Sequence, residues 1–232
     1  MEMIDIAFFP TSSLVYQAYI LNPNMTAASP FLVRDAGATE EDTLFIVSTF
    51  DSILPELDSI GSHEQWGSIP FSQRGDFTKE TMMDLAHSEK YRLTGNSGAN
   101  GLRVFIVERE YPKDSANSSD REISAYIRGA ADGRRYLPVG FAYVRENWVP
   151  DYVKSQPQLQ LPDTERDEFL YLEVMVTDTR VGSLRRGAGA ALIRGIKDYA
   201  RSRQKQALWV DSWAGNGRKL VKYVYPHLYC LL

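Results

Sequence analysis

One segment constrains the fold more than any other, because an apolar stretch, a glycine-rich turn and an amphipathic helix follow each other directly. Residues 169–176 are strongly apolar, which is typical of a strand buried on both faces of a sheet. The run Arg-Arg-Gly-Ala-Gly lies at 185–189. Residues 188–203 then place Leu192 and Ile196 on one helical face and charged side chains elsewhere. The chain is therefore expected to build a sheet that this helix covers.

The remaining apolar segments predict a mixed α/β sheet and not a regular alternation of strand and helix. Helices are expected to begin near Thr39, where acidic residues follow in the first turn, and near Thr78. A length of 232 residues with 44% hydrophobic and 24% charged residues is ordinary for one globular domain. The expected order is strand, two helices, three strands, helix, strand and helix, with strands at 31–34, 101–108, 137–144, 169–176 and 207–213.

The first thirty residues are expected to form an N-terminal extension, with the main domain at 31–232. Residues 1–21 are fairly apolar, but they begin with acidic side chains and are interrupted by Pro10 and Gln17. That pattern suits neither a signal peptide nor a membrane span. Residues 25–30 read like a protein start. Residues 1–24 are accordingly either an appendage outside the main fold or an extra strand or helix docked on it.

The charge and cysteine content exclude several classes of function. A net charge of −4 argues against a nucleic-acid binder that relies on bulk positive charge. Cys230 is the single cysteine, so no intrachain disulfide can form, which suits a reducing compartment. The three histidines are scattered and form no metal-binding spacing. We expect a cytoplasmic protein with no metal, nucleic-acid or membrane partner.

The glycine-rich run between strand and helix has the properties of an anion site. Gly187 and Gly189 let the backbone turn tightly, and the helix N-terminus directs free N–H groups at an anion. Arg185 and Arg186 add positive charge. A dinucleotide fingerprint would need a third glycine where Leu192 stands, so that reading is disfavoured. The other alternative is a glycine-rich turn with no ligand.

At this point the sequence resembles the GNAT superfamily of acetyl-CoA-dependent N-acetyltransferases, over roughly 31–223 and most closely over 169–223. The pyrophosphate loop of that family reads Gln/Arg-x-x-Gly-x-Gly/Ala. Gly187 and Gly189 occupy its two small positions, while its leading position falls on Leu184, with Arg185 beside it. The pattern Asn-x6-Tyr that follows in the family is present as Asn216 and Tyr223.

The resemblance implies an acyl-CoA N-acyltransferase fold, with a mixed, mostly antiparallel sheet flanked by helices. It implies acetyl-CoA as donor and an amine-bearing small molecule or peptide as acceptor, joined by direct attack. Tyr223 would be the general acid near the sulfur. The coenzyme-binding residues that the resemblance implies, two of them at the end of the splayed strand nearest the thioester, are Met175, Val176, Arg185, Arg186, Gly187, Ala188, Gly189, Ala190 and Asn216.

Attack by an amine also requires a base, because an ammonium ion has no lone pair to offer. Glu173 lies inside the apolar strand, where burial would raise its pKa, and an unpaired carboxylate there would be costly. Glu168 lies at the start of the same strand and shares side-chain parity with Val176. Both are candidate bases, and a solvated strand end is the alternative for Glu168.

The acceptor side and the C-terminus are less defined by the resemblance. It assigns the acceptor pocket to loops at 61–75 and 147–162, which carry Trp66, Trp148 and Tyr152, although these rings also suit anchoring of the loops. The family adds two strands after its last helix, and only 224–232 remain here. The strand at 207–213 is therefore expected to have an exposed edge. That edge predicts low transfer activity and a possible homodimer.

Two further readings of the function remain open at this stage. The first is a non-catalytic coenzyme A-binding protein, or an inactive shortened member of the same fold. The second is a binding domain with no coenzyme, for which the glycine-rich loop would be a coincidence. Stabilisation by coenzyme A would separate the first from the second, because a ligand that binds only the native state raises its stability.

Overall fold

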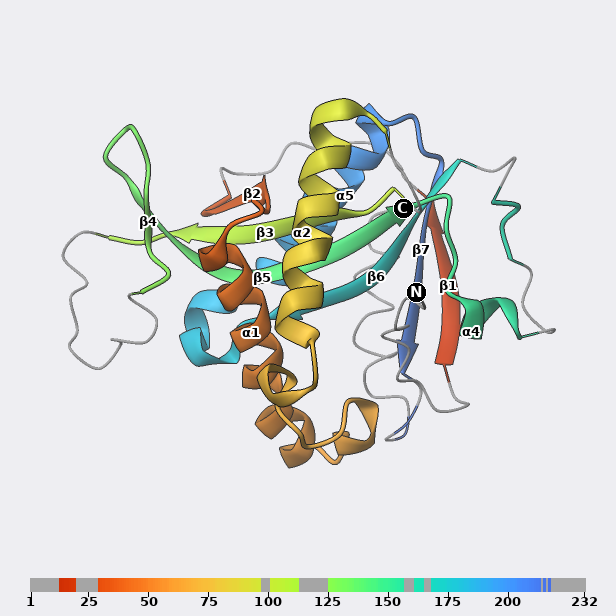
Figure 1. Ribbon diagram of the computed structural model, residues 1–232, viewed down its shortest axis with the longest axis horizontal. Coiled ribbons are helices and arrows are strands. Elements are labelled where there is room, and N and C mark those ends of the chain that lie inside the picture. The colour runs from red at the N-terminus through yellow and green to blue at the C-terminus, as the bar shows by residue number, and fades with distance from the viewer. Residues whose placement is uncertain are drawn as a thin grey trace.

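The computed structural model describes residues 13–19, 29–96, 101–112, 125–156, 161–164, 168–213, 215 and 217. These residues form a mixed sheet of seven strands, in which six lie in the order β1-β7-β6-β5-β3-β2 and the short β4 pairs with β5 (Figure 1). Neighbouring strands are antiparallel except for the parallel pair β6 and β7. The strands are β1 (Ser13–Tyr19), β2 (Phe31–Asp35), β3 (Arg103–Glu110), β4 (Arg128–Gly129), β5 (Arg135–Glu146), β6 (Phe169–Thr177) and β7 (Ala207–Trp213).

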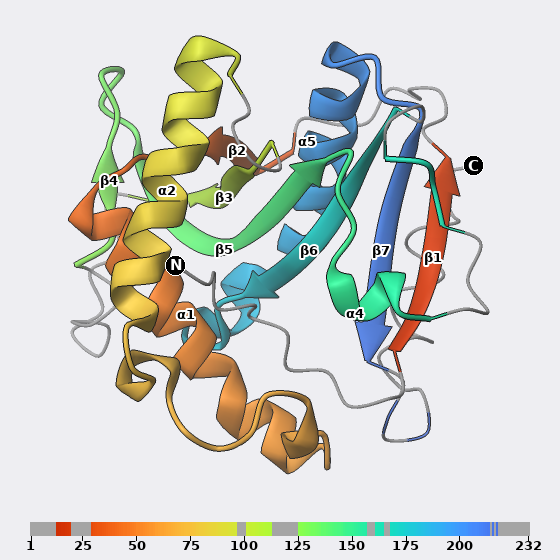
Figure 2. The same ribbon diagram turned by 45° about the vertical axis from the view of Figure 1, so that its right-hand side comes forward.

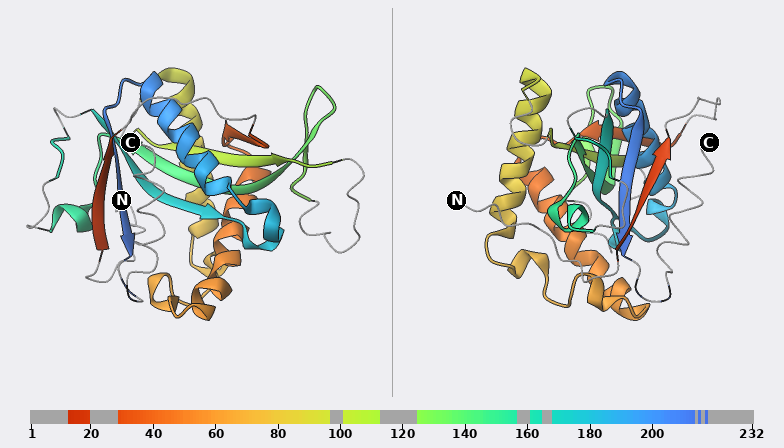
Figure 3. Two further views of the ribbon diagram at one scale, coloured as in Figure 1. Left: turned by 180° about the vertical axis from the view of Figure 1, so that it is seen from behind. Right: turned by 90° about the vertical axis from the view of Figure 1, so that its right-hand side faces the viewer.

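Helices cover both faces of this sheet. Two long helices, α1 (Glu40–Ser59) and α2 (Phe77–Thr94), lie on one face, and α5 (Ala188–Ser202) crosses the other (Figure 3). Short elements complete the fold: α4 (Asp151–Lys154) and the 3-10 turns η1 (His63–Gln65), η2 (Phe71–Gln73) and η3 (Thr179–Arg185). The predicted mixed α/β sheet flanked by helices is confirmed. The strands β3, β5 and β6 are central, which explains their nearly continuous apolar sequences.

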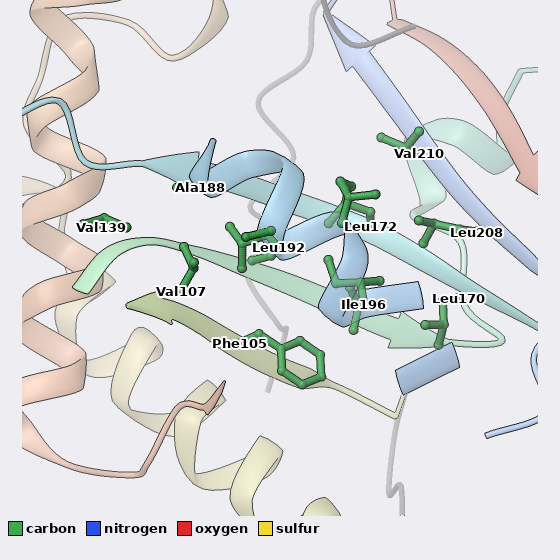
Figure 4. Packing of buried hydrophobic residues seen from close by; sticks show 14 of the residues in the cluster. Phe105, Val107, Val139, Leu170, Leu172, Ala188, Leu192, Ile196, Leu208 and Val210 are labelled. Carbon is green, nitrogen blue, oxygen red and sulfur yellow. The ribbon is translucent and has the colours of Figure 1, made fainter. Parts of the chain in front are cut away.

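The face under α5 holds the larger part of the core. Leu192 and Ile196 are fully buried and point from the helix at the sheet, as the helical spacing predicts (Figure 4). They meet alternate side chains of the strands, among them Val107, Leu170 and Leu208. Burial of such a side chain contributes roughly 1.5–3 kcal/mol. This packing fixes the position of the N-terminus of α5 against the end of β6.

The edge of β7 is covered, which overturns the prediction of an exposed strand there. β1 pairs with β7 along its whole length in antiparallel register, from Ser13 opposite Trp213 to Tyr19 opposite Ala207. Of the two alternatives for the first residues of the chain, the extra docked strand is the one observed for 13–19. The predicted ending, with its last helix and the segment 224–232, lies outside the described residues apart from positions 215 and 217.

The start of α1 agrees with the sequence, and the start of α2 does not. The Thr39 side chain accepts a hydrogen bond from the backbone N–H of Asp42, as a helix cap does. The second helix begins at Phe77, one residue before the predicted cap Thr78. Phe77 is buried in the aromatic cluster below the helix, and this packing sets the helix start.

A buried network of ion pairs joins α1 to the strands β2, β3 and β4. Glu108 on β3 has no exposed surface, and both of its carboxylate oxygens accept hydrogen bonds. Arg34 on β2 donates to it over 2.7 Å, and Arg128 on β4 donates over 2.6 Å. Arg34 also donates to both oxygens of Asp42 in the first turn of α1. Glu108 therefore joins three strands, and Arg34 connects them to α1 through Asp42.

Candidate functional site

The N-terminus of α5 is open, as an anion-binding helix end must be. Gly187 precedes the helix with φ of +91°, a left-handed conformation that glycine adopts without strain. No side chain among the described residues accepts a hydrogen bond from the first backbone N–H groups of the helix. These groups and the helix dipole both favour an anion at this end.

Charge and steric access at this helix end come from its neighbours in sequence. Arg186 is exposed, and its guanidinium makes no hydrogen bond or ion pair to the described residues. Arg185 donates instead to Glu56 over 2.7 Å and to the Thr177 hydroxyl over 3.3 Å. Arg185 thus links η3 to α1, and Arg186 is the cation left available to a ligand.

The small residues of the turn leave one side of the helix end accessible. Ala188 is completely buried under the helix, whereas Ala190 is exposed. A Cβ placed on Gly189 would meet only the Met175 methyl, at 3.8 Å. Met175 therefore reaches from β6 to the glycine turn, and the fold brings these predicted residues together at one end of the sheet.

The adjacent strands β6 and β7 separate on the way to this helix end. They pair in parallel only from Phe169 opposite Ala207 to Leu172 opposite Val210. Beyond that point β6 pairs with β5 alone and β7 with β1 alone, so the two strands diverge (Figure 2). Alternate backbone N–H and C=O groups of β6 after Leu172 consequently face the opening without a strand partner among the described residues.

A β-bulge lies where the separation begins. Tyr143 on β5 is opposite Val174, but the next residue, Val144, is opposite Leu172. Glu173 is therefore an extra residue on β6. Bulges of this kind redirect a side chain and increase the local twist. Here the bulge turns the end of β6 away from β7 and presents Glu173 beside the opening.

Two buried polar groups lie on the part of β7 that no longer pairs with β6. Ser212 and Trp213 are 7% and 3% exposed, and neither the Ser212 hydroxyl nor the Trp213 indole N–H has a hydrogen-bond partner among the described residues. Buried polar groups are nearly always hydrogen bonded in folded proteins. Both residues belong to the part of β7 that has left β6. These groups suit a polar ligand held between the strands.

Glu173 faces α2 and has an ion partner, contrary to the unpaired state considered from sequence. The Arg145 Nε donates to it over 2.7 Å, and Arg145 also lies 4.8 Å from the centre of the Trp148 ring. Asp84 from α2 completes the group. Burial raises the pKa of Asp84 to about 6. The Arg145 charge lowers this pKa, and the Glu173 charge raises it further.

A second carboxylate on this face is held by two tyrosines. Asp211 on β7 accepts hydrogen bonds from Tyr152 at 2.8 Å and from Tyr171 at 2.5 Å. Burial raises the pKa of Asp211, although both hydroxyls favour its ionised form. Tyr152, predicted on the acceptor side, thereby anchors the short helix α4 to the sheet next to the opening.

The other predicted residues are distributed differently. Val176 is 4% exposed and packs into the core below α1, so only its backbone is available. Glu168 lies at the opposite end of β6, where it accepts a hydrogen bond from Lys205. The fold does not bring it near the glycine turn. Asn216 and Tyr223 lie outside the described residues.

Sequence reasoning missed Asp84, Arg145 and Asp211. A signal was present for Asp211, because it interrupts an apolar strand just as Glu173 does. Asp84 lies three residues after Thr81 and four before Ser88, so it is on the buried side of α2. The sequence hides this side, because the apolar residues Met82 and Met83 are exposed and suggest another buried face. Arg145 follows the last apolar residue of its strand and carries no sequence signal of its own.

The raised pKa of Asp84 predicts a pH-dependent effect on stability. Its pKa rises from 3.8 to about 6 on folding, so the folded state binds the proton more tightly and loses stability as pH increases from about 4 to about 6. Asp84→Asn removes that penalty. We expect the variant to exceed the wild type by about 1–3 kcal/mol at pH 7, with the advantage disappearing towards pH 4. Urea unfolding across this range measures the difference, and an advantage independent of pH would contradict it.

Comparisons with known proteins identify no family for the chain. No family model matches the chain, and no curated protein matches it. Among solved structures, the tetramutant of the BH1408 protein from Bacillus halodurans is similar, with a TM-score of 0.44, 13% identity and coverage of 84% of this chain and 90% of that one. In the described part of the chain, no helix has the length and hydropathy required to cross a bilayer. Nor do those residues include a group of three or more His, Cys, Asp or Glu side chains placed to hold a metal ion.

Proposed function

We propose that the chain is an N-acetyltransferase with the acyl-CoA N-acyltransferase fold, and that it transfers an acetyl group from acetyl-CoA to an amine. One observation carries the proposal. The strands β6 and β7 separate after Leu172 and Val210, and the uncapped N-terminus of α5 follows β6 at the same end. An opening between two strands next to an anion site suits a ligand with a phosphate at one end and an extended amide chain at the other.

The residues at the helix end fit the pyrophosphate. Its negative charge would be balanced by free backbone N–H groups and by the exposed Arg186. Gly189 leaves space for the pyrophosphate because it has no side chain. A Cβ at this position would point at the proposed ligand, with the Met175 methyl as its neighbour. Arg185 contributes less than the sequence implies, since Glu56 already engages its guanidinium.

The opening fits the pantetheine arm, which carries two amide groups and can pair with a strand edge as a peptide does. The unpaired groups of β6 beyond Leu172 supply such an edge. The Ser212 hydroxyl supplies a further donor or acceptor, and it lies on the α5 side of β7 with Leu208 and Val210. A ligand amide at this position would satisfy a buried group that is otherwise unpaired among the described residues.

The bulge and its carboxylates suit the chemistry of acyl transfer. Acetyl-CoA supplies an activated thioester when bound. We place the amine on the face that carries Glu173, Tyr152 and Asp211, because polar side chains gather there beside the opening, whereas the face under α5 is an apolar core. Three carboxylates and one arginine on this face favour a positively charged acceptor, a description that fits both a small amine and a peptide amine. A backbone N–H group left unpaired by the bulge would stabilise a developing negative oxygen.

Ligand-dependent unfolding tests the proposal. We expect acetyl-CoA and coenzyme A to raise the melting temperature of the full chain, and NAD to leave it unchanged. Release of a free thiol in the presence of primary amines then measures transfer. Stabilisation without thiol release would identify a non-catalytic coenzyme A-binding protein. Absence of stabilisation by either coenzyme A species would exclude both functions.

Arg186→Ala tests the anion site with little risk to the fold, because Arg186 is exposed and its guanidinium makes no hydrogen bond or ion pair to the described residues. We expect it to weaken acetyl-CoA binding by about 1.5–3 kcal/mol, the usual contribution of a hydrogen bond to a charged group. Arg194→Ala is the matched control, since Arg194 is an equally exposed arginine two turns along α5. Calorimetric titration compares the two, and equal affinities would contradict the site.

A further inference from the structure

We propose that Asp84 is the general base of the transfer, accepting the proton that an acceptor ammonium must lose before its nitrogen can attack. The inference rests on the proposed function and adds a catalytic residue from α2, an element to which the sequence assigned no chemistry. It is carried by the position of Asp84 on the sheet-facing side of α2, by its charged neighbours Arg145 and Glu173, and by the lack of a hydrogen-bond partner for Asp84 in the described part of the chain.

The helix directs Asp84 at the sheet. The buried residues of α2 recur at Phe77, Thr81, Ser88 and Tyr91, and position 84 continues this stripe at intervals of three and four. The sheet residues that interact with its charge are Arg145 on β5 and Glu173 on β6. The Asp84 carboxylate is therefore close enough to Arg145 and Glu173 to feel their charges, on the α2 side of the sheet from which we propose that the acceptor approaches.

Of the three carboxylates described at the opening, Glu173, Asp211 and Asp84, only Asp84 has no hydrogen-bond or ion-pair partner among the described residues. Glu173 is engaged by the Arg145 guanidinium, and Asp211 already accepts two tyrosine hydroxyls. Asp84 makes no hydrogen bond or ion pair to any residue that the structure describes, although it is only partly exposed. A carboxylate without donors keeps its lone pairs for a substrate proton.

The charges around Asp84 suit a base that works near neutral pH. Burial is the main cause that raises its pKa to about 6, and Glu173 together with Glu80 of its own helix adds to the increase. Arg145 limits the rise. Tyr143, the remaining titratable group facing it from β5, has a pKa well above its usual value and stays neutral. At pH 7 the carboxylate is thus mostly ionised and still a reasonable proton acceptor.

The step balances as follows. The ammonium passes one proton to the Asp84 carboxylate, which becomes a neutral carboxylic acid, and the amine regains its lone pair. The amine nitrogen then forms a bond to the thioester carbon, the carbon–sulfur bond breaks, and the sulfur leaves with the electron pair. The second proton lost from nitrogen neutralises the thiolate. Asp84 returns its proton to water, so the products are an amide, a thiol and one released proton.

Asp84→Asn tests the proposal in the full chain, with Glu89→Gln as the matched control from the same helix. Glu89 pairs with Arg92 on the outer side of α2, over 3.6 Å. With a primary alkylamine as acceptor, we expect Asp84→Asn to lower kcat/KM at pH 7 by roughly 100- to 1,000-fold, the lower part of the range for general base catalysis. The acid limb near pH 6 should disappear, while the Kd for acetyl-CoA stays within about twofold of the wild type.

Carboxyl carbon NMR of the ligand-free protein gives a readout that is independent of turnover. We expect an aspartate resonance that titrates near pH 6 in the wild type and in Glu89→Gln and is absent from Asp84→Asn. If the wild type transfers acetyl groups and Asp84→Asn retains its rate and acid limb, Asp84 is not the base and the proposed function stands. If the wild type neither binds acetyl-CoA nor releases thiol, the proposed function and this inference both fail.

Discussion

Gly189→Asp is expected to raise the Kd for acetyl-CoA at least about 100-fold, a loss of roughly 3 kcal/mol. The substitution puts a carboxylate where the pyrophosphate is proposed to bind, and it repels that group directly. The helix itself should tolerate the change, because an acidic residue in the first turn of α5 is favoured by the helix dipole. Calorimetric titration measures the affinity, and thermal unfolding verifies that the variant is folded.

Gly189→Ala is the matched control for this substitution. A Cβ at this position makes only an ordinary contact with Met175 at 3.8 Å, so the alanine variant should bind acetyl-CoA within a few-fold of the wild type. It should also be slightly more stable, since alanine is the better helix former. Gly187 is unsuitable for the comparison, because its φ of +91° would strain any side chain. Equal affinities for the aspartate and alanine variants would exclude this helix end as the anion site.

Glu108→Gln is expected to destabilise the fold by about 3–5 kcal/mol, the usual cost of removing one partner from a buried ion pair. The amide keeps the shape of the side chain but has one oxygen and no charge for Arg34 and Arg128. Glu108 has no exposed surface, so water cannot replace the lost interactions. Urea unfolding at pH 7 gives the free energy directly.

Asp198→Asn serves as the comparison for Glu108→Gln. Asp198 pairs with Arg201 on the solvent side of α5, with a side chain that is 74% exposed. Its loss should change the free energy of unfolding by less than about 0.5 kcal/mol, as measured for exposed helix pairs. A similar small effect for Glu108→Gln would mean that the network does not stabilise the fold.

Local features of the chain could be predicted from sequence because short-range physics determines them. The helix at Ala188–Ser202 and the strands at Phe169–Thr177 and Ala207–Trp213 follow from apolar periodicity and from the glycines between them. The cap at Thr39 follows from a hydroxyl that can reach the backbone N–H of Asp42. The turn at Gly187 was predicted because its left-handed backbone conformation favours glycine.

Features that depend on pairing between distant segments could not be predicted. The edge of β7 was expected to be exposed, because too few residues follow it for further strands, whereas β1 from the start of the chain covers it. Nothing in an apolar segment specifies which strand edge it joins. The bulge at Glu173 depends on a register shift against β5, which leaves no local signal. The partnership of Glu173 with Arg145 follows from that shift, and for this reason an isolated carboxylate was expected where an ion pair is present.

The pairing of β1 with β7 also has a consequence for biosynthesis. β1 leaves the ribosome before every other described strand, and β7 leaves after all of them. Ser13 can therefore pair with Trp213 only after nearly the whole described chain has been synthesised. Such a high contact order slows folding, because the long intervening chain must be ordered first. Meanwhile the nascent chain carries an apolar, uncharged strand, Ser13–Tyr19, with no native partner yet made. Until Trp213 has been synthesised, this strand is therefore free to pair with the edge of another chain, so the last step of sheet assembly is the one most exposed to aggregation.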